Sequence, residues 1–379
     1  MAQTVRLLAT AAMGLESVVA QEVKQLGYDV QVDNGKVMYD APISAIPRSN
    51  LWLRSADRVK LQIGQFEAAT FDDLFEATKA LPWEQFITEE GKFPVSGKSV
   101  KSTLHSVPDC QAIVKKAIAE RLKLKYGVAG KLAETGALFK VEVAIHKDEA
   151  VLTIDTSGSG LHKRGYRTGQ GEAPLKETMA AALVLLTNWK PDEPFLDPFS
   201  GSGTIPIEAA LIGQNIAPGF NRDFASEEWK WIKKRYWDEA FEEVEDKANY
   251  DQKLNIRGSD IDHKLIGIAK SNAEEAGLGD LITWKQMQAR DLTITATNGY
   301  LVTNPPYGER LGDKSEIASL YQDLGSIMHT HPSWSVYILS AFAEFEKYYG
   351  ETATKKRKLF NGFIQTDYYQ YFGKKQNNV

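Results

Sequence analysis

The sequence has only one cysteine, Cys110, among 379 residues. A single thiol cannot form an intramolecular disulfide, and it leaves too few thiolates for a zinc or iron–sulfur cluster. The histidines do not compensate, because none shows metal-ligand spacing with carboxylates or thiols: His105, His146, His162, His263, His329 and His331. We therefore expect no metal requirement, and the scarcity of cysteine fits the reducing cytoplasm.

Long apolar runs and a strong positive charge are also missing. No uninterrupted apolar stretch approaches the roughly 18 residues that suggest a membrane span, so we expect a soluble protein with no membrane partner. The net charge of -5 argues against indiscriminate coating of nucleic acid, although a local basic face could still attract phosphate. Apolar residues at 43% and charged residues at 25% are typical of a folded globular chain.

The length predicts two to three domains, at about 150 residues for each. A Ser/Gly run at residues 157–160 marks the main boundary, so domains are expected at 1–160 and 161–379. The first domain has small α+β patterns. Its strands are expected at 5–11, 36–39, 58–66, 93–99, 139–146 and 150–155, and its helices at 14–26, 71–80 and 110–126.

Strand and helix patterns alternate in the second domain. Short buried strands are expected at 195–199, 255–260, 282–286, 300–304 and 335–340, with helical segments between them. This alternation predicts an α/β fold with a mostly parallel sheet. A Trp-rich, charged helical insertion is expected at 221–247, and β-prone runs on both sides of Thr366 and Asp367 predict a closing antiparallel hairpin.

A glycine loop stands where the first strand of this domain turns into a helix. Its residues include Asp197, Ser200, Gly201, Gly203 and Thr204. The glycines let the backbone approach a ligand. A phosphate loop would end in Gly-Lys-Ser/Thr, and a dinucleotide fingerprint would need a third glycine where Pro206 stands, so neither nucleotide motif is present. A plain strand-to-helix turn remains the simpler interpretation.

Acidic residues follow the next two expected strands. Asp260 and Asp262 follow one strand, where a carboxylate can accept both hydroxyl protons of a ribose. Asp291 follows the other, where its carboxylate or the adjacent backbone could lie near an adenine amino group. A solvated loop acid is the competing interpretation of Asp291.

Asn304, Pro305, Pro306 and Tyr307 follow the expected strand 300–304 and form the most informative tetrapeptide. The two prolines fix the backbone and remove two donors, which leaves the Asn304 amide oxygen and the Pro305 carbonyl as acceptors for a planar amine. Tyr307 can stack on the base that carries this amine. Accepting both hydrogens makes an aromatic amine more nucleophilic. If the amine attacks the methyl group of a sulfonium, which is already electrophilic, the transfer needs alignment more than a strong base. The simpler alternative is a rigid turn.

The glycine loop, residues 258–262 and the Asn-Pro-Pro-Tyr tetrapeptide together resemble the Rossmann-like amino-methyltransferase family. Residues 161–167, 173–178 and 308–311 more narrowly resemble THUMP-containing guanine-N2 RNA methyltransferases, similar to bacterial enzymes of 23S ribosomal RNA. The resemblance implies an N-terminal ferredoxin-like and THUMP region for RNA docking, and a seven-stranded catalytic domain with a terminal reversed strand. The longest relatives carry a second catalytic domain that this chain lacks, which leaves the ribosomal target open.

The resemblance also implies S-adenosylmethionine as cofactor and a role for each matching residue. Asp197, Ser200, Gly201, Gly203 and Thr204 would lie at its methionine end, Asp260 and Asp262 at its ribose, and Asp291 at its adenine. Thr178, beside Lys176, would close over its carboxylate. Asn304, Pro305, Pro306 and Tyr307 would hold the target base.

Basic residues predict an RNA-docking face, with a solvated surface as an equal alternative. The residues concerned are Lys115, Lys116, Lys163, Arg164 and Arg167. The run 355–358 is also basic, but such runs are usually solvated, and we do not predict a site there.

The expected function is therefore methyl transfer from S-adenosylmethionine to guanine N2 in RNA, with 23S ribosomal RNA as the expected partner and protein partners unknown. A transfer RNA guanine-N2 methyltransferase and a DNA adenine-N6 methyltransferase remain alternatives, because the same acceptors suit other amines. A noncatalytic RNA-binding assembly factor is the alternative outside enzymes, since a fold alone does not establish turnover.

Overall fold

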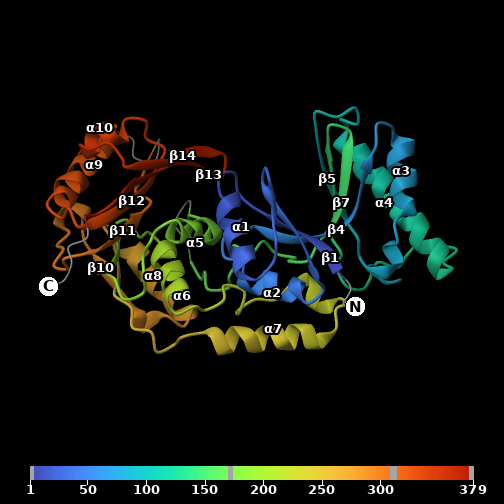
Figure 1. The fold of residues 1–379 in the computed structure, drawn as a ribbon, viewed down its shortest axis with the longest axis horizontal. Helices are drawn as coiled ribbons and strands as arrows, with labels where there is room; N and C mark the ends of the chain where they lie inside the picture. Colours follow the sequence, from blue (N-terminus) through green and yellow to red (C-terminus); the bar gives the residue numbers. More distant parts are fainter. Residues whose placement is uncertain (1–3, 170–173, 308–313, 375–379) are drawn as a thin grey trace. The chain divides into compact units, whose positions relative to one another are not determined.

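The computed structural model describes residues 4–169, 174–307 and 314–374 (Figure 1). The chain divides into two compact units. The first contains Met1–Thr10, Ala20–Leu161 and Asp223–Glu243, and the second contains Ala11–Val19, His162–Arg222 and Val244–Val379. The continuous segments 1–160 and 161–379 expected from the sequence differ from this division by two exchanged segments, 11–19 and 223–243, and by Leu161, which belongs to the first unit.

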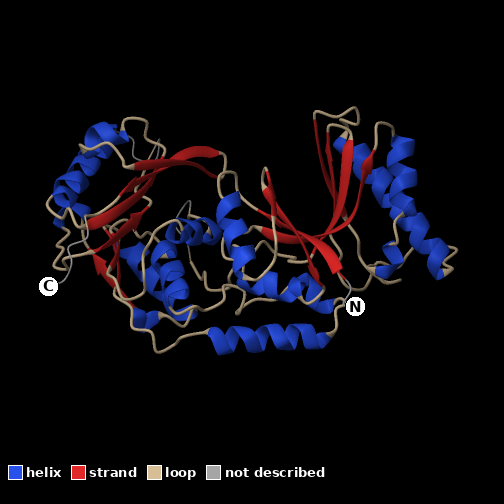
Figure 2. Ribbon diagram, viewed as in Figure 1, coloured by secondary structure: helices blue, strands red, loops and turns tan. Residues whose placement is uncertain are grey.

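The first unit is built on a mixed seven-stranded sheet (Figure 2). In order across the sheet, the strands are β2 (Gln31–Asp33), β3 (Lys36–Pro42), β1 (Thr4–Thr10), β4 (Arg58–Glu67), β7 (Glu149–Asp155), β6 (Val141–His146) and β5 (Val95–Val100). β5 and β6 pair in parallel, and the other neighbours pair antiparallel. Its helices are α2 (Ala45–Trp52), α3 (Phe71–Ala80), η1 (Trp83–Gln85), α4 (Val107–Tyr126) and η2 (Ala225–Glu228). Helices α1 (Glu16–Gln25) and α7 (Lys234–Lys247) have residues in both units.

The charged insertion expected at 221–247 contributes most of its residues to the first unit. Trp229 is buried there, where its ring stacks on Phe139 with 5.0 Å between centroids and its Nε1 donates to the carbonyl of Leu138. From α7, the Glu243 carboxylate accepts two hydrogen bonds from Arg48, at 2.5 and 2.8 Å. Aromatic stacking and a bidentate ion pair thus attach the insertion to the N-terminal unit.

The second unit is an α/β domain with a seven-stranded sheet between two layers of helices. In order across the sheet, the strands are β10 (Ile282–Gln286), β9 (Ile256–Asp260), β8 (Phe195–Asp197), β11 (Gly299–Thr303), β12 (Trp334–Ser340), β14 (Ile364–Tyr371) and β13 (Lys355–Asn361). β14 is antiparallel to both of its neighbours, and the pairs from β10 to β12 are parallel. The helices are α5 (Glu177–Leu185), α6 (Thr204–Gly213), α8 (His263–Glu275), α9 (Lys314–His329) and α10 (Phe345–Tyr349), with short turns η3 (Gly279–Leu281) and η4 (Ala289–Asp291). The expected mostly parallel sheet with a reversed last strand is confirmed.

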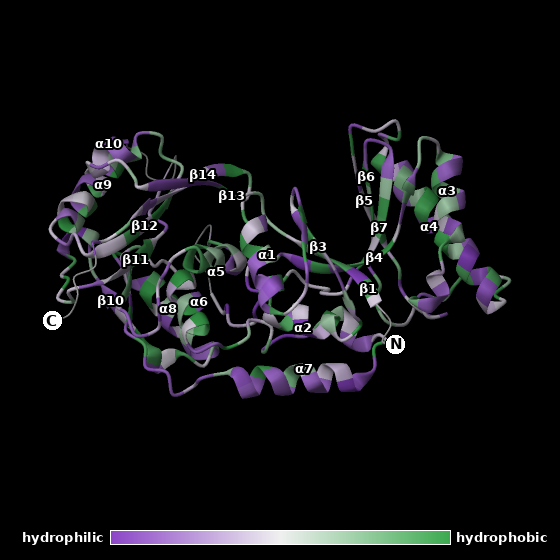
Figure 3. Ribbon diagram, viewed as in Figure 1, coloured by the Kyte–Doolittle hydropathy of each residue, from purple (hydrophilic) through white to green (hydrophobic). Residues whose placement is uncertain are grey.

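The central strands are apolar on both faces because helices cover both sides (Figure 1). Alternate residues of β11 point to opposite faces: Tyr300 and Val302 join the core with α5 and α6, whereas Leu301 joins the core with α9 and α10. Figure 3 shows that α5 and α6, which cover the sheet, are mainly hydrophobic, whereas α7 is mainly hydrophilic. Burial on both sides fixes the carboxyl ends of these strands, where the polar loops begin.

The closing hairpin exists, but its turn was predicted at the wrong place. Asn361 pairs with Ile364, so the turn consists of Gly362 and Phe363, and Gly362 has the positive φ of +64° that favours glycine. Thr366 and Asp367 instead pair with Leu359 and Lys358 inside the ladder. The prediction rested on the β-prone runs on both sides of Thr366 and Asp367, whereas Thr366 is itself buried in the ladder and donates its hydroxyl to the Leu359 carbonyl.

Among the helices that the structure describes, none is both long enough and apolar enough to span a bilayer.

Candidate active site

A cavity of about 1000 Å³ opens at the carboxyl ends of β8, β9 and β11 in the second unit. Parallel strands bring their carboxyl ends to one edge of a sheet. The chain adds β9 on one side of β8 and later β11 on the other side, and ligands of such folds bind at this switch point. Loops that follow these strands supply Asp197, Asp260 and Asn304 to the cavity. Residues 174–175, 288–290 and 361 and one side of α9 complete its lining.

The glycine loop is held by backbone hydrogen bonds at both ends. Ser200 N donates to the Ser259 carbonyl at 2.9 Å, and Gly203 N donates to the Ser200 carbonyl at 2.8 Å. Gly201 and Gly203 have φ of +52° and +86°, backbone conformations that are strained in residues with a side chain. Gly201 lines the cavity and Gly203 does not. A Cβ at Gly203 would lie 2.6 Å from the ring of Trp284. Gly203 is therefore a packing glycine behind the loop.

Asp197 is almost fully buried at the end of β8. Burial raises the pKa of its carboxyl from 3.8 to about 7, against the opposing hydrogen bonds from Thr303 Oγ1 at 2.5 Å and from the Phe199 amide at 3.1 Å. The nearby charge of Asp260 raises this pKa further. Asp197 thus connects β8 to the residue directly before Asn304.

Asp260 connects the glycine loop to the end of β9. Its Oδ2 accepts from the Gly201 amide at 3.0 Å, and its Oδ1 accepts from the Asp262 amide at 3.0 Å. Burial raises the pKa of this carboxyl as well. Asp262 caps the N-terminus of α8, and its Oδ1 accepts from the Lys264 amide at 2.8 Å. Between the two acids, Ile261 is 64% exposed and faces the cavity as an apolar surface.

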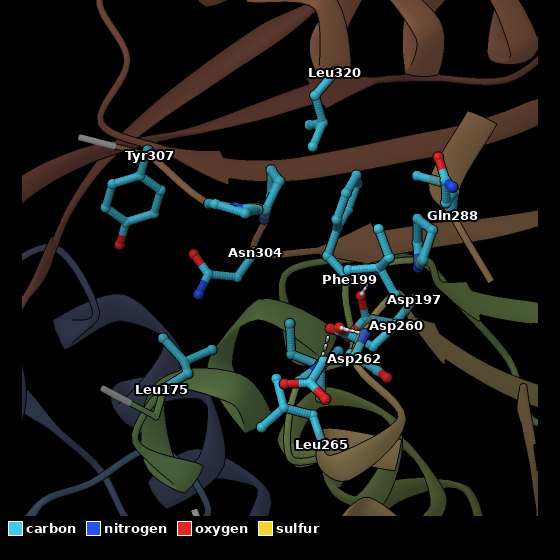
Figure 4. Close-up of a pocket in the computed structure, with 18 of the residues that line it drawn as sticks. Leu175, Asp197, Phe199, Asp260, Asp262, Leu265, Gln288, Asn304, Tyr307 and Leu320 are labelled. Atoms are coloured by element: carbon cyan, nitrogen blue, oxygen red, sulfur yellow. Dashed lines mark hydrogen bonds between the residues drawn. The ribbon is translucent and has the colours of Figure 1, made fainter. Parts of the chain in front are cut away.

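The Asn-Pro-Pro-Tyr segment forms the opposite part of the cavity. In Figure 4, Asn304 points into the space between Tyr307 and the three carboxylates. The Asn304 Oδ1 is buried and accepts no hydrogen bond from any residue that the structure describes. Tyr321 donates to the Pro306 carbonyl at 3.0 Å, and Asn361 Nδ2 donates to the Tyr307 hydroxyl at 2.9 Å. A rigid loop therefore presents an unsatisfied acceptor, which is what a ligand amine requires.

Two other predicted cofactor residues lie outside this cavity. Thr178 is buried in the first turn of α5 and does not line it. Asp291 is exposed: η4 turns the chain so that Gln288, Ala289 and Arg290 reach the cavity in its place, with the Asp291 amide bonded to the Gln288 carbonyl at 3.0 Å. The remaining predicted cofactor and base residues line the cavity: Asp197, Ser200, Gly201, Thr204, Asp260, Asp262, Asn304, Pro305, Pro306 and Tyr307.

Several lining residues were not predicted, and most of them lie outside the three loops that follow the strands. Four of them lie along one side of α9 with spacings of three, four and seven: Glu316, Ser319, Leu320 and Asp323. Phe199, Leu175, Gln288 and Asn361 are others. The α9 spacing is visible in the sequence but also describes any polar helix side, so it gave no usable signal. Ala173 and residues 308–311, which contributed to the family resemblance, lie outside the described residues.

The predicted basic face is only partly exposed. Arg164 is 3% exposed beside the buried carboxylate of Glu208, so it cannot present its charge to RNA in this structure. Arg167 is largely enclosed too: it pairs with Glu177 at 2.7 Å and donates to Ser202 and Thr204 of the glycine loop. Lys163 is exposed.

The two lysines of α4 differ in their surroundings. Lys116 is exposed, whereas Lys115 is half-buried, with its ammonium 2.6 Å from Glu134 and 3.5 Å from the centre of the Phe93 ring. Lys115 therefore stabilises the first unit, and Lys116 and Lys163 are the exposed members of the predicted set.

Comparison with known protein families gives three matches in order along the chain. Residues 6–60 match the RlmL ferredoxin-like domain, residues 68–155 match the THUMP domain, and residues 164–370 match the RMKL-like methyltransferase domain. The chain belongs to the RMKL-like methyltransferase family. The methyl donor of this family is S-adenosylmethionine.

Similar proteins agree with this membership over the whole chain. The Bacillus subtilis protein named Putative RNA methyltransferase YpsC is 63% identical over 97% of this chain and 96% of its own length. Ribosomal RNA large subunit methyltransferase K/L of Shewanella baltica strain OS185 is 35% identical over 94% of this chain, and the chain spans about half (51%) of that relative.

Solved structures agree as well. SMU.472, described as a putative methyltransferase complexed with SAH, has a TM-score of 0.95 at 48% identity and covers each chain fully. A Listeria monocytogenes structure, described as a predicted N6-adenine-specific DNA methylase, has a TM-score of 0.94 at 62% identity and covers 98% of this chain and 97% of its own.

Proposed function

We propose that this chain transfers a methyl group from S-adenosylmethionine to the exocyclic N2 amine of a guanine in RNA, with 23S ribosomal RNA as the substrate. The observation that supports this reaction most directly is the buried, unsatisfied Asn304 Oδ1 in the same cavity as the glycine loop. RNA as the substrate class is supported by the THUMP match and by relatives that are named RNA and ribosomal RNA methyltransferases.

The residues on one side of the cavity fit S-adenosylmethionine. The buried Ser200 Oγ has no hydrogen-bond partner among the described residues, so it can bond a polar group of the cofactor's amino acid portion. The Asp260 and Asp262 carboxylates can accept ribose hydroxyls with their remaining lone pairs, while Ile261 offers an apolar surface to the adenine ring. When bound, the cofactor supplies a methyl group that is already electrophilic on its sulfonium.

The other side of the cavity suits a base that carries an amine. The Asn304 Oδ1 and the Pro305 carbonyl can accept the two amine hydrogens, which directs the nitrogen lone pair out of the ring. The Tyr307 ring, held through its hydroxyl by Asn361, can stack on the base. Because Asn304 does not ionise, this arrangement works by alignment rather than by a strong base.

Methylation of adenine N6 in DNA is the second candidate, since the Listeria monocytogenes structure with 62% identity is described as a DNA methylase of this kind. Asn304 chemistry suits either amine, so the cavity alone does not distinguish them. The THUMP match favours RNA. The cytoplasmic location stays a prediction from the single cysteine.

Transfer of labelled methyl from S-adenosylmethionine to unmodified ribosomal RNA, transfer RNA and DNA pools tests these assignments. We expect label in ribosomal RNA. Label in transfer RNA alone would move the substrate to transfer RNA, and label in DNA alone would support the second candidate. Cofactor binding without label in any pool would favour a noncatalytic assembly factor.

A further inference from the structure

The tip of the β13–β14 hairpin exposes apolar side chains. Phe363 is fully exposed at 106%, and Ile364 is 47% exposed. We call residues 362–364 the hairpin tip. A single exposed aromatic residue is common on protein surfaces and would not by itself indicate a partner. Its position in the fold gives it more significance.

The hairpin tip is directly connected to the active site. Asn361, the last residue of β13, lines the cavity and donates a hydrogen bond to the Tyr307 hydroxyl at 2.9 Å. Phe363 follows two residues later, so its Cα lies within about 7 Å of the Cα of Asn361. A polymer whose base occupies the site beside Tyr307 would therefore pass close to Phe363.

The strand that leads to the tip is positively charged. Lys355, Lys356 and Lys358 of β13 are exposed. Lys356 is paired with Glu346 at 2.8 Å, whereas Lys355 and Lys358 form no ion pair with any described residue. Lys358 lies five residues before Phe363, whereas Lys355 stands at the far end of β13, opposite Gln370. An unpaired ammonium group on the strand that ends in an exposed aromatic ring suits a partner with both phosphates and bases.

We propose that the hairpin tip and the adjoining end of β13 form a substrate-docking surface for RNA, in which Phe363 stacks on a base next to the target nucleotide and Lys358 contacts a backbone phosphate. This proposal rests on RNA as the substrate of the proposed function. An enzyme that modifies a base amine takes the base out of its stack, and an aromatic ring can replace the lost stacking of the neighbouring base. Such stacking tolerates different bases, because every base has a flat face.

The direct test measures the affinity of the full chain for unmodified ribosomal RNA fragments by fluorescence anisotropy at fixed salt, together with kcat/KM for methyl transfer. We expect F363A to weaken RNA binding about tenfold and F363Y to restore it, with cofactor affinity unchanged. F372A is the matched control: Phe372 is also exposed, at 49%, but it follows the other end of β14, about 25 Å along the strand. F372A should bind RNA like the native chain.

Lys358 has a separate expected result, and the other two lysines of β13 are its controls. K358A should reduce the slope of log affinity against log salt by about one. K355A and K356A should change it less, because Lys355 lies at the far end of β13 and Lys356 is already paired.

Equal RNA affinity of F363A and the native chain would overturn the proposal, as would an F363A variant that dissociates a dimer of this chain in light scattering while RNA binding stays intact. If F363A weakens RNA binding but the native chain never methylates the bound RNA, the docking surface is supported and the proposed reaction is rejected. Failure of the native chain to bind RNA would reject both.

Discussion

The Thr303 hydroxyl donates a hydrogen bond to the buried Asp197 carboxylate, with 2.5 Å between Oγ1 and Oδ1. These residues end the adjacent strands β11 and β8, and each is followed directly by one half of the active site. This hydrogen bond therefore adds to the pairing of β8 with β11 in fixing the glycine loop and the Asn-Pro-Pro-Tyr segment relative to each other. This connection explains how two loops about a hundred residues apart in sequence can align a methyl group with an amine.

Replacement of Asp260, but not of the nearby acid Asp291, should weaken cofactor binding. D260N removes the charge that accepts the Gly201 amide and that we propose binds the ribose. The cofactor dissociation constant should therefore rise at least about tenfold, the effect of one charge-assisted hydrogen bond. Isothermal titration calorimetry measures it. D291N is the matched control, because Asp291 is exposed and does not line the cavity. Equal weakening in both variants would show that the cofactor contacts Asp291 as well.

Tyr321 should act as a positioning residue for the Asn-Pro-Pro-Tyr segment. Y321F keeps the buried ring but removes the hydrogen bonds to the Pro306 carbonyl and to Ser340, so kcat should fall about tenfold while cofactor affinity is unchanged. Y368F removes a comparable buried bond, to the Leu183 carbonyl, away from the cavity. Both variants should lose about 1 kcal/mol of stability, but only Y321F should lose turnover. A kcat equal to that of the native chain in Y321F would remove this role.

Asp197 should make folding stability depend on pH. Its pKa is raised from 3.8 to about 7 by burial, so the folded chain holds this proton more tightly than the unfolded chain. The resulting stabilisation is full below pH 3.8 and is lost as the pH rises toward 7. The native chain should therefore lose stability relative to D197N between pH 5 and 8, by up to a few kcal/mol at about 1.4 kcal/mol per pKa unit. Denaturant unfolding at both pH values measures the difference, and parallel losses in the two proteins would contradict it.

Elements with a clear pattern could be predicted from the sequence. β10 and α3 have the predicted limits, because their apolar spacing matches strand and helix periods. α2 was missed: it contains Pro47 and is buried on most sides, so it has no amphipathic pattern. β2 was missed because all three of its residues are exposed.

The candidate site divides in the same way. Residues that directly follow a strand, such as Asp260 and Asn304, could be placed because parallel strands end at one edge of the sheet. Asn361 could not, because its contact with Tyr307 depends on the hairpin register, and the predicted turn was four residues away. The burial of Arg164 beside Glu208 was equally hidden, since an ion pair 44 residues apart leaves no local pattern.

The most direct test of the central claim is nucleoside mass spectrometry of unmodified 23S ribosomal RNA after incubation with S-adenosylmethionine and either the native chain or N304A. Because the Asn304 Oδ1 accepts no hydrogen bond from the described residues, N304A should fold and bind the cofactor normally, yet methylate at least about 100-fold more slowly. The account predicts N2-methylguanosine with the native chain and almost none with N304A. A different methylated nucleoside would contradict the proposed amine, and equal product from N304A would contradict the role of Asn304.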